Sequence, residues 1–252
     1  VLAAYDLGLA RTAPGSAAAA HVAVAQEVAK APGVERVALS QVAPLSGSVS
    51  TESLTVAGYV PGPDESPEAE VVPIGVGYFE TLGVRVHQGR SFTDADRAGA
   101  PAVAVINRAF AERYFPGRSP IGESLSIVTG AMTVVGVVEN LRAHDLVEAA
   151  PPLLYLALAQ RPGAEQVAET YVFARFRGVA AADQLQSVEA AVRRALPGVP
   201  VYEVGPFSDR FEAKVSPQLF IGAALRFFGF LGLILLATGT YAVVAHRGSL
   251  RR

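Results

Sequence analysis

The chain contains no cysteine among its 252 residues. This absence excludes disulfide scaffolds, zinc sites with cysteine ligands and thiol nucleophiles. It is compatible with the cytosol and with a periplasmic protein that avoids disulfides, so it assigns no compartment. An excess of one charge sign is missing too, since the formal net charge is −2, and no basic stripe precedes the C-terminal residues. We therefore expect no nucleic-acid partner.

Motifs for nucleotide and catalytic chemistry are also missing. No G-x-x-x-x-G-K-[ST] stretch occurs, so the chain does not hydrolyse ATP through a P-loop. The four histidines, His21, His87, His144 and His246, show no spacing typical of a ligand set. His144 and the adjacent Asp145 lack a nucleophile in a G-x-S-x-G setting. We therefore expect no catalytic residue, no cofactor-binding residue and no metal ligand, and we interpret the protein as a non-enzyme.

Two aspartates in the run SFTDADRAGA are the best candidates for binding a divalent cation. Asp94 and Asp96 supply too few oxygen ligands to complete a calcium or magnesium site. A turn capped by Thr93 explains the same residues better, and it is the structure we expect here.

Two stretches far apart in the sequence share one strand–helix–strand pattern. The first joins the strand VLAAYDLGLA, a helix that begins at Ser16 and ends at Pro32-Gly33, and the strand VERVALSQV. The second joins the strand TYVFARFRG, a helix that ends at Pro197-Gly198, and the strand VPVYEV. Within TYVFARFRG, the side chains of Val172, Ala174 and Phe176 should share one face and those of Arg175 and Arg177 the other.

The matched units predict an α/β (α+β) fold with a split domain. Residues 1–76 and 146–205 would form the split domain itself, and residues 77–145 a smaller inserted α/β subdomain. Inside the insertion, PAVAVINRAFAERYFPG predicts a strand over 102–106 and a short helix from Asn107 to Phe115. Residues 206–252 would form a stalk and a transmembrane helix with a basic cytoplasmic end.

The segment from Phe227 to Ala245 carries no charged residue. As a helix it would be roughly 28 Å long, close to the ~30 Å hydrocarbon core of a bilayer. One end is flanked by Arg226, and the other by a basic cluster made of His246, Arg247, Arg251 and Arg252. Because cytoplasmic flanks are enriched in basic residues, we expect that cluster to face the cytoplasm and residues 1–215 to lie in the periplasm. The competing interpretation is a buried core helix.

Two further features bear on this terminal helix. Ser216 followed by Pro217 is typical of a helix start, so the helix would extend above the membrane as a stalk. Gly229, Gly232 and Gly239 fall on one helical face that could admit a neighbouring helix. Since the chain opens on Val1 within a strand, we also expect a membrane helix upstream of it.

Four segments carry a family resemblance, in the order APGVERVALSQVAPLSG, VPIGVGYFETLGVRVHQGRSFTDAD, AVAVINRAFAERYFPGRSPIGESL and VVGVVENLRAHDL. They resemble the periplasmic core domain of MacB-like and FtsX-like ABC transporter permeases, and the orphan permeases among them most closely. The order from GYFETLGV through GRSF to NRAFAERYFPGRSPIG is the most specific part. AHRGSLRR is similar to the basic stretch with which this family enters the cytoplasm after its second helix.

The resemblance covers nearly the whole chain and implies a function in the bacterial inner membrane. It implies a porter-like part with an inserted subdomain, contact with the lipid bilayer and with other transmembrane helices of the same permease, an ABC ATPase subunit and a homodimer partner. Export of antimicrobials, peptides or lipoproteins, or mechanotransmission, is the activity it implies. Two alternatives stay open: a membrane-anchored periplasmic scaffold or sensor without a transport role, and a membrane-anchored periplasmic enzyme.

Overall fold

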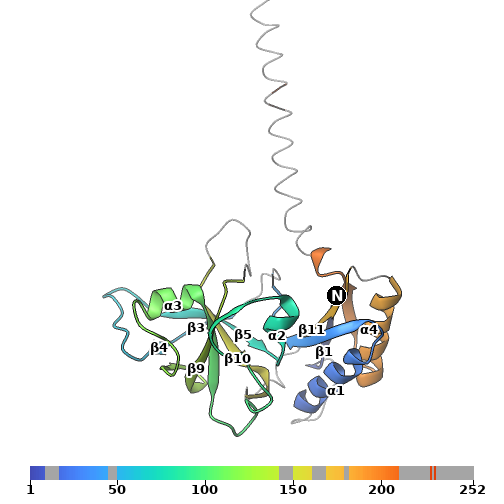
Figure 1. Cartoon of the computed structure of the whole chain (residues 1–252), viewed down its shortest axis with the longest axis horizontal. Coiled ribbons are helices and arrows are strands. Elements are labelled where there is room, and N and C mark those ends of the chain that lie inside the picture. Colours follow the sequence, from blue (N-terminus) through green and yellow to red (C-terminus); the bar gives the residue numbers. More distant parts are fainter. Residues whose placement is uncertain are drawn as a thin grey trace, which may run out of the picture. The chain divides into compact units, whose positions relative to one another are not determined.

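The computed structural model describes residues 1–8, 17–44, 50–141, 150–160, 169–178 and 182–209, together with Phe228 and Phe230. The chain divides into two compact units, Val1–Phe207 and Ser208–Arg252, here called unit 1 and unit 2. All helices and strands with assigned bounds belong to unit 1 (Figure 1). In unit 2 only Ser208, Asp209, Phe228 and Phe230 are described.

The predicted membrane helix falls almost entirely in the undescribed part of unit 2. In the ranges that the structure describes, no helix combines the length and apolarity needed to cross a bilayer. The stalk start at Ser216-Pro217, the glycine face and the basic end lie outside the described residues. The span and its orientation therefore stay predictions.

The first group of elements in unit 1 comes from the two ends of its sequence. Its strands lie in the order β12-β1-β11-β2, with every neighbouring pair antiparallel. Each helix connects two strands that have a third strand between them, which is the split βαβ arrangement. Both predicted strand–helix–strand units are thus present: β1 (Leu2–Asp6), α1 (Ala17–Ala29), β2 (Val34–Ser40), β11 (Glu169–Phe176), α4 (Ala182–Ala195) and β12 (Val201–Gly205).

Strand β11 shows the predicted alternation of faces. Val172, Ala174 and Phe176 pack into one hydrophobic core together with residues of α1 and α4. The opposite face is buried as well, because Tyr171 and Phe173 belong to a second core. The sequence pattern identified the first face correctly but did not reveal the second.

The second group of elements comes from the middle of the sequence. Its strands follow the order β5-β10-β7-β9-β8-β4, while β3 pairs with β5 and β6 pairs with β9. The pairs β5–β10 and β7–β9 are parallel. The elements are β3 (Ser50–Ser53), β4 (Thr55–Val56), β5 (Glu68–Ile74), β6 (Val86–Gly89), β7 (Val103–Asn107), α3 (Arg108–Tyr114), β8 (Ser124–Ile127), β9 (Gly130–Val138), β10 (Leu153–Ala157) and the 3₁₀ turn η2 (Leu158–Gln160).

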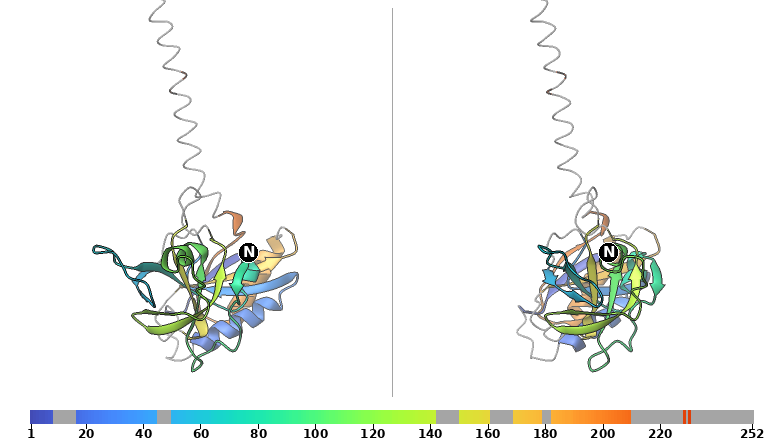
Figure 2. Two further views of the ribbon diagram at one scale, coloured as in Figure 1. Left: turned by 60° about the vertical axis from the view of Figure 1, so that its left-hand side comes forward. Right: turned by 90° about the vertical axis from the view of Figure 1, so that its left-hand side faces the viewer.

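Strand pairing bears on the expected division of the chain. The predicted porter-like part includes residues 1–76 and 146–205. Within these ranges, however, β3 pairs with β5, and β10 pairs with both β5 and β7, so all three strands belong to the second group. In Figure 1 the elements of the two groups gather on opposite sides of α2 (Tyr78–Leu82), and the left-hand view of Figure 2 keeps them apart. The boundaries at residues 77 and 145 stay a prediction.

Asn107 is the N-cap of α3, which begins one residue after the predicted start, and it also fixes the helix to a neighbouring strand. Its Oδ1 atom accepts hydrogen bonds from the backbone N–H groups of Phe110 and Leu153, both at 2.9 Å. Its Nδ2 atom donates to the Pro151 carbonyl at 2.8 Å. The first bond is a typical N-cap, and the other two connect the start of α3 to β10. An asparagine before a helix predicts the cap, whereas nothing in the sequence predicts the bonds to β10.

Candidate functional site

The two ends of unit 1 lie on adjacent strands. Leu2 of β1 is paired with Gly205 of β12, and Tyr5 with Val201. On the other side of β1, the Val1 nitrogen donates to the Ala174 carbonyl at 2.8 Å and Ala174 N–H donates to the Val1 carbonyl at 2.9 Å. The first and last strands of unit 1 are therefore neighbours whose backbones are hydrogen-bonded. We call β1, β11 and β12 together the terminal strands.

Side chains add to the connection between the terminal strands. The Tyr202 hydroxyl of β12 donates to Glu169 Oε1 of β11 at 3.0 Å, reaching across β1. Burial and the Glu169 carboxylate raise the pKa of Tyr202, so its hydroxyl stays protonated and remains a donor. Phe207 follows β12 and packs edge-on against Phe173, with ring centroids 5.7 Å apart. A displacement at either end of unit 1 thus acts on a bonded group of three strands.

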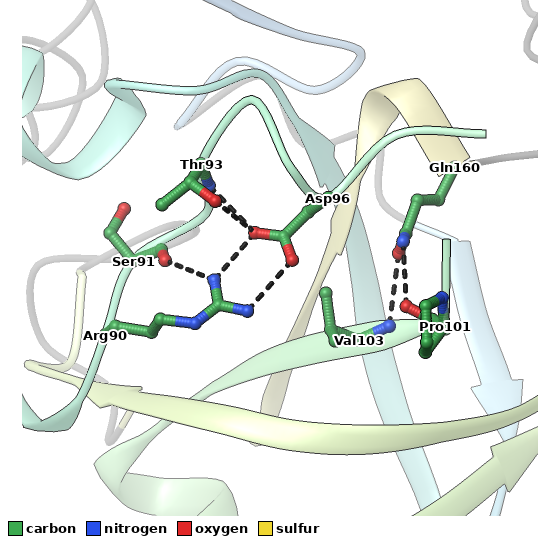
Figure 3. Close-up of polar contacts among 7 residues, drawn as sticks. All are labelled: Arg90, Ser91, Thr93, Asp96, Pro101, Val103 and Gln160. Carbon is green, nitrogen blue, oxygen red and sulfur yellow. Dashed lines mark hydrogen bonds and ion pairs between the residues drawn. The ribbon is translucent and has the colours of Figure 1, made fainter. Parts of the chain in front are cut away.

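The loop between β6 and β7 is held by the Arg90–Asp96 ion pair (Figure 3). Arg90 donates through Nη1 to Asp96 Oδ2 at 2.7 Å and through Nη2 to Oδ1 at 2.9 Å. Thr93 donates to the same carboxylate through its backbone N–H at 2.8 Å and its hydroxyl at 3.2 Å. The Arg90 guanidinium and these Thr93 bonds keep the pKa of the Asp96 carboxyl below its usual value.

These bonds engage the Asp96 carboxylate fully within the protein. Both of its oxygens already accept hydrogen bonds, and the side chain is only 6% exposed. Asp96 N–H donates to the Thr93 carbonyl at 2.9 Å, which closes the predicted turn. Asp94 is exposed beside it. The turn is confirmed, and in its cap Thr93 donates while the Asp96 carboxylate accepts.

The far end of the same loop is tied to the 3₁₀ turn η2 (Figure 3). Gln160 donates through Nε2 to the Pro101 carbonyl at 2.9 Å and accepts at Oε1 from Val103 N–H at 3.1 Å. At the start of the loop, the backbone of Arg90 lies very close to β9. A Cβ on Gly136 of β9 would lie 2.1 Å from the Arg90 carbonyl oxygen. The loop 90–102 is therefore fixed near its start by the Arg90–Asp96 pair and at its end by Gln160 of η2. These are the features of a structural loop rather than of a binding loop.

The two described histidines, His21 and His87, have separate partners. His21 of α1 is buried, and its Nδ1 atom lies 2.5 Å from the Tyr5 hydroxyl. Burial lowers the pKa of His21 to about 4, so the ring is neutral at physiological pH. His87 lies 3.5 Å from the Glu139 carboxylate at the surface. His144 and His246 lie outside the described residues.

No constellation for metal or acid–base chemistry emerges from the described ranges. Within them, no group of three or more His, Asp or Glu side chains is arranged to hold a metal ion. An open groove of about 510 Å³ lies between α3 and β6, and its described lining contains no hydroxyl or thiol nucleophile. Two arginines of this groove already pair with glutamates, Arg108 with Glu112 at 3.2 Å and Arg118 with Glu123 at 3.4 Å. The terminal strands are therefore the feature with the clearest functional meaning.

Comparison with known proteins finds similarity to one family of periplasmic domains. Residues 6–195 match the family model of the MacB-like periplasmic core domain. An uncharacterized ABC transporter permease, YknZ of Bacillus subtilis strain 168, is 32% identical over 88 residues, which are 34% of this chain and 22% of that protein. The macrolide export ATP-binding/permease protein MacB of Sodalis glossinidius is 33% identical over 76 residues, or 29% of this chain and 12% of that protein.

A solved structure shares the fold. The periplasmic region of MacB from Actinobacillus actinomycetemcomitans matches with a TM-score of 0.54 at 16% identity, covering 85% of this chain and 92% of that one. The alignments to the two curated relatives cover 22% and 12% of their lengths. The similarity thus concerns one domain of these larger proteins.

Proposed function

The chain belongs to the family of MacB-like periplasmic core domains, and on this premise we propose that unit 1 transmits motion in an ABC-transporter permease. One observation carries the proposal: the first and last strands of unit 1, β1 and β12, are paired, with Leu2 opposite Gly205. If both ends are attached to membrane helices, a relative movement of those helices acts directly on the terminal strands. A domain that is only tethered would not need this arrangement.

The proposal includes a location and partners. Unit 1 lies in the periplasm, and residues 227–245 cross the inner membrane with the C-terminal arginines in the cytoplasm. The partners are the lipid bilayer, the other transmembrane helices of the same permease, a separate ABC ATPase subunit and a second copy of the permease. The transported substrates belong to the antimicrobial, peptide or lipoprotein classes. The support is family membership together with the apolar run and basic flank of the sequence.

The proposal assigns no enzymatic activity to this chain. It rests on the absence of a P-loop in the sequence and on the buried or ion-paired state of the polar groups described above. ATP turnover by the purified chain, persisting after removal of contaminating ATPases, would contradict this part of the proposal.

The decisive experiment interrupts the connection at the end of unit 1. A flexible Gly-Ser linker of about eight residues, inserted between Phe207 and Ser208 of the full-length protein, behaves as a random coil and transmits little force. We expect loss of transport or resistance at unchanged expression. The matched control carries the same linker between Val128 and Thr129, in the exposed turn between β8 and β9. Full activity of the Phe207 insertion variant would instead favour the scaffold or sensor.

A further inference from the structure

The two groups of strands in unit 1 meet at a narrow seam. Among the described residues, a single strand pair joins them, Ser40 of β2 with Ile74 of β5. Two backbone hydrogen bonds flank it, from Gln41 N–H to the Pro73 carbonyl at 3.0 Å and from Gly75 N–H to the Leu39 carbonyl at 2.8 Å. The neighbouring strand pairs on either side extend over five or more residues. The sheet is thus least constrained where its two groups join.

The hydrophobic cores follow the same division. One core consists of second-group residues alone, such as Ile106 and Phe110. Another packs α1 and α4 onto the first group, with Leu158 as its contribution from the second. The third core spans the seam and takes residues from both groups, with α2 between them.

Helix α2 supplies the aromatic rings that cross the seam. The Phe79 ring lies 4.9 Å from that of Tyr155 in β10, in edge-to-face geometry. The Tyr78 ring contacts Tyr155 at 6.4 Å and Phe173 of β11 at 5.7 Å. Phe173 in turn contacts Phe207, the last residue of unit 1. A continuous series of rings therefore runs from the second group to the point where the chain leaves the domain.

Few hydrogen bonds hold this series of rings in place. The Tyr155 hydroxyl is buried and has no hydrogen-bond partner among the described residues. A small cavity of about 10 Å³ borders Tyr78 and Tyr155. By contrast, α2 is bonded to the first group, because Arg175 of β11 donates to the carbonyls of Glu80 and Thr81 at 3.2 and 3.4 Å. Contacts between rings can shift without breaking a hydrogen bond, so movement is easiest between α2 and β10.

We propose that the seam is a hinge, and that α2 and its rings couple the hinge to the exit of unit 1 at Phe207. This inference rests on the proposed function, because the role of the hinge would be to carry a displacement of the terminal strands into the second group. It assigns a role to the segment GYFETLG, residues 77–83, in which Gly77 and Gly83 adopt positive φ angles of 79° and 74° at the two ends of α2.

The first test measures the hinge itself on the full-length protein. This chain has no cysteine. Once any cysteine outside it has been replaced by serine, spin labels can be placed at Val128→Cys in the second group and Ala190→Cys on α4. Both positions are exposed. We expect Phe79→Leu to broaden the distribution of distances between the labels. Phe110→Leu is the matched control, because Phe110 is equally buried but lies in the core that does not cross the seam. Equal distributions in the two variants would overturn the inference.

The second test locks the seam and does not depend on a core substitution in α2. A Cβ on Gly75 would lie 3.5 Å from the Cβ of Leu39, within the range of a disulfide. We expect oxidised Leu39→Cys/Gly75→Cys protein to lose transport and reductant to restore it, while each single variant is unaffected by oxidant. Transport by the locked protein, combined with loss of transport in the Phe207 linker variant, would refute the hinge and leave the proposed function intact. An active linker variant would refute the proposed function, whatever the label distances show.

Discussion

Lowering the pH from 7 to 5 should weaken unit 1 by about 2 kcal/mol through one buried side chain, His21. Its pKa is about 4 in the folded unit, because burial disfavours the charged ring, against an ordinary value of 6.5. The unfolded chain therefore binds a proton more readily than the folded one across this interval. The contribution of the neutral His21 ring to the free energy of unfolding is fully present above the ordinary pKa of histidine. It is lost as the pH falls toward the pKa of His21 in the folded unit.

The geometry supports a neutral ring. The side chain is 5% exposed, and Nδ1 shares a hydrogen bond with the Tyr5 hydroxyl. In the neutral tautomer that leaves Nδ1 unprotonated, Tyr5 is the donor of this bond. Burial also raises the pKa of Tyr5, so the phenol remains a donor throughout this pH range. Protonation of His21 would remove the acceptor and place a charge in the core beneath α1.

The assay is urea denaturation followed by pulse proteolysis of the full chain at pH 7 and pH 5. His21→Asn is the matched variant, because the amide oxygen of Asn can accept from Tyr5 and does not titrate near neutral pH. We expect the wild type to lose about 2 kcal/mol more stability than this variant over the interval. The same loss in both proteins would refute the assignment to His21.

Three further perturbations test the loop and the start of α3. Arg90→Ala should lower the stability measured by urea denaturation by about 1–3 kcal/mol, because the buried Asp96 carboxylate loses both guanidinium bonds, and Arg90→Lys should lower it less. Gly136→Ala should give little soluble folded protein on a chromatography assay, since its Cβ would overlap a backbone oxygen, whereas Gly205→Ala, with no atom within 4 Å, should behave as wild type. Asn107→Ala should cost about 1–3 kcal/mol in the same denaturation assay, and a loss indistinguishable from zero would argue against its three hydrogen bonds.

Local patterns in the sequence predicted local structure well. Alternation in β11, the helix start at Asn107 and the turn near Asp96 depend on neighbouring residues, and the structure shows all three. The bidentate pair between Arg90 and Asp96 is also local, at a separation of six residues. Its sequence separation alone does not reveal that Asp96 is buried.

Strand partners could not be read from the sequence. The pairing of β5 with β10 brings together residues about eighty positions apart, such as Val72 and Tyr155. Both strands are short apolar runs that could equally have joined the first group, and nothing local distinguishes the choices. The seam follows from that pairing, and so does the meeting of Tyr78, Phe173 and Phe207. The functional interpretation of the terminal strands likewise needed the register between Leu2 and Gly205.

The central claim is that movement at the ends of unit 1 changes its internal arrangement. The most direct measurement is the distance between spin labels at Val128→Cys and Ala190→Cys in the full-length protein, reconstituted in liposomes with its ATPase, with and without trapped nucleotide. We predict that nucleotide shifts the distribution, and that the Gly-Ser linker after Phe207 abolishes the shift. Identical distributions in the presence and absence of nucleotide, or a shift that persists in the linker variant, would contradict the claim.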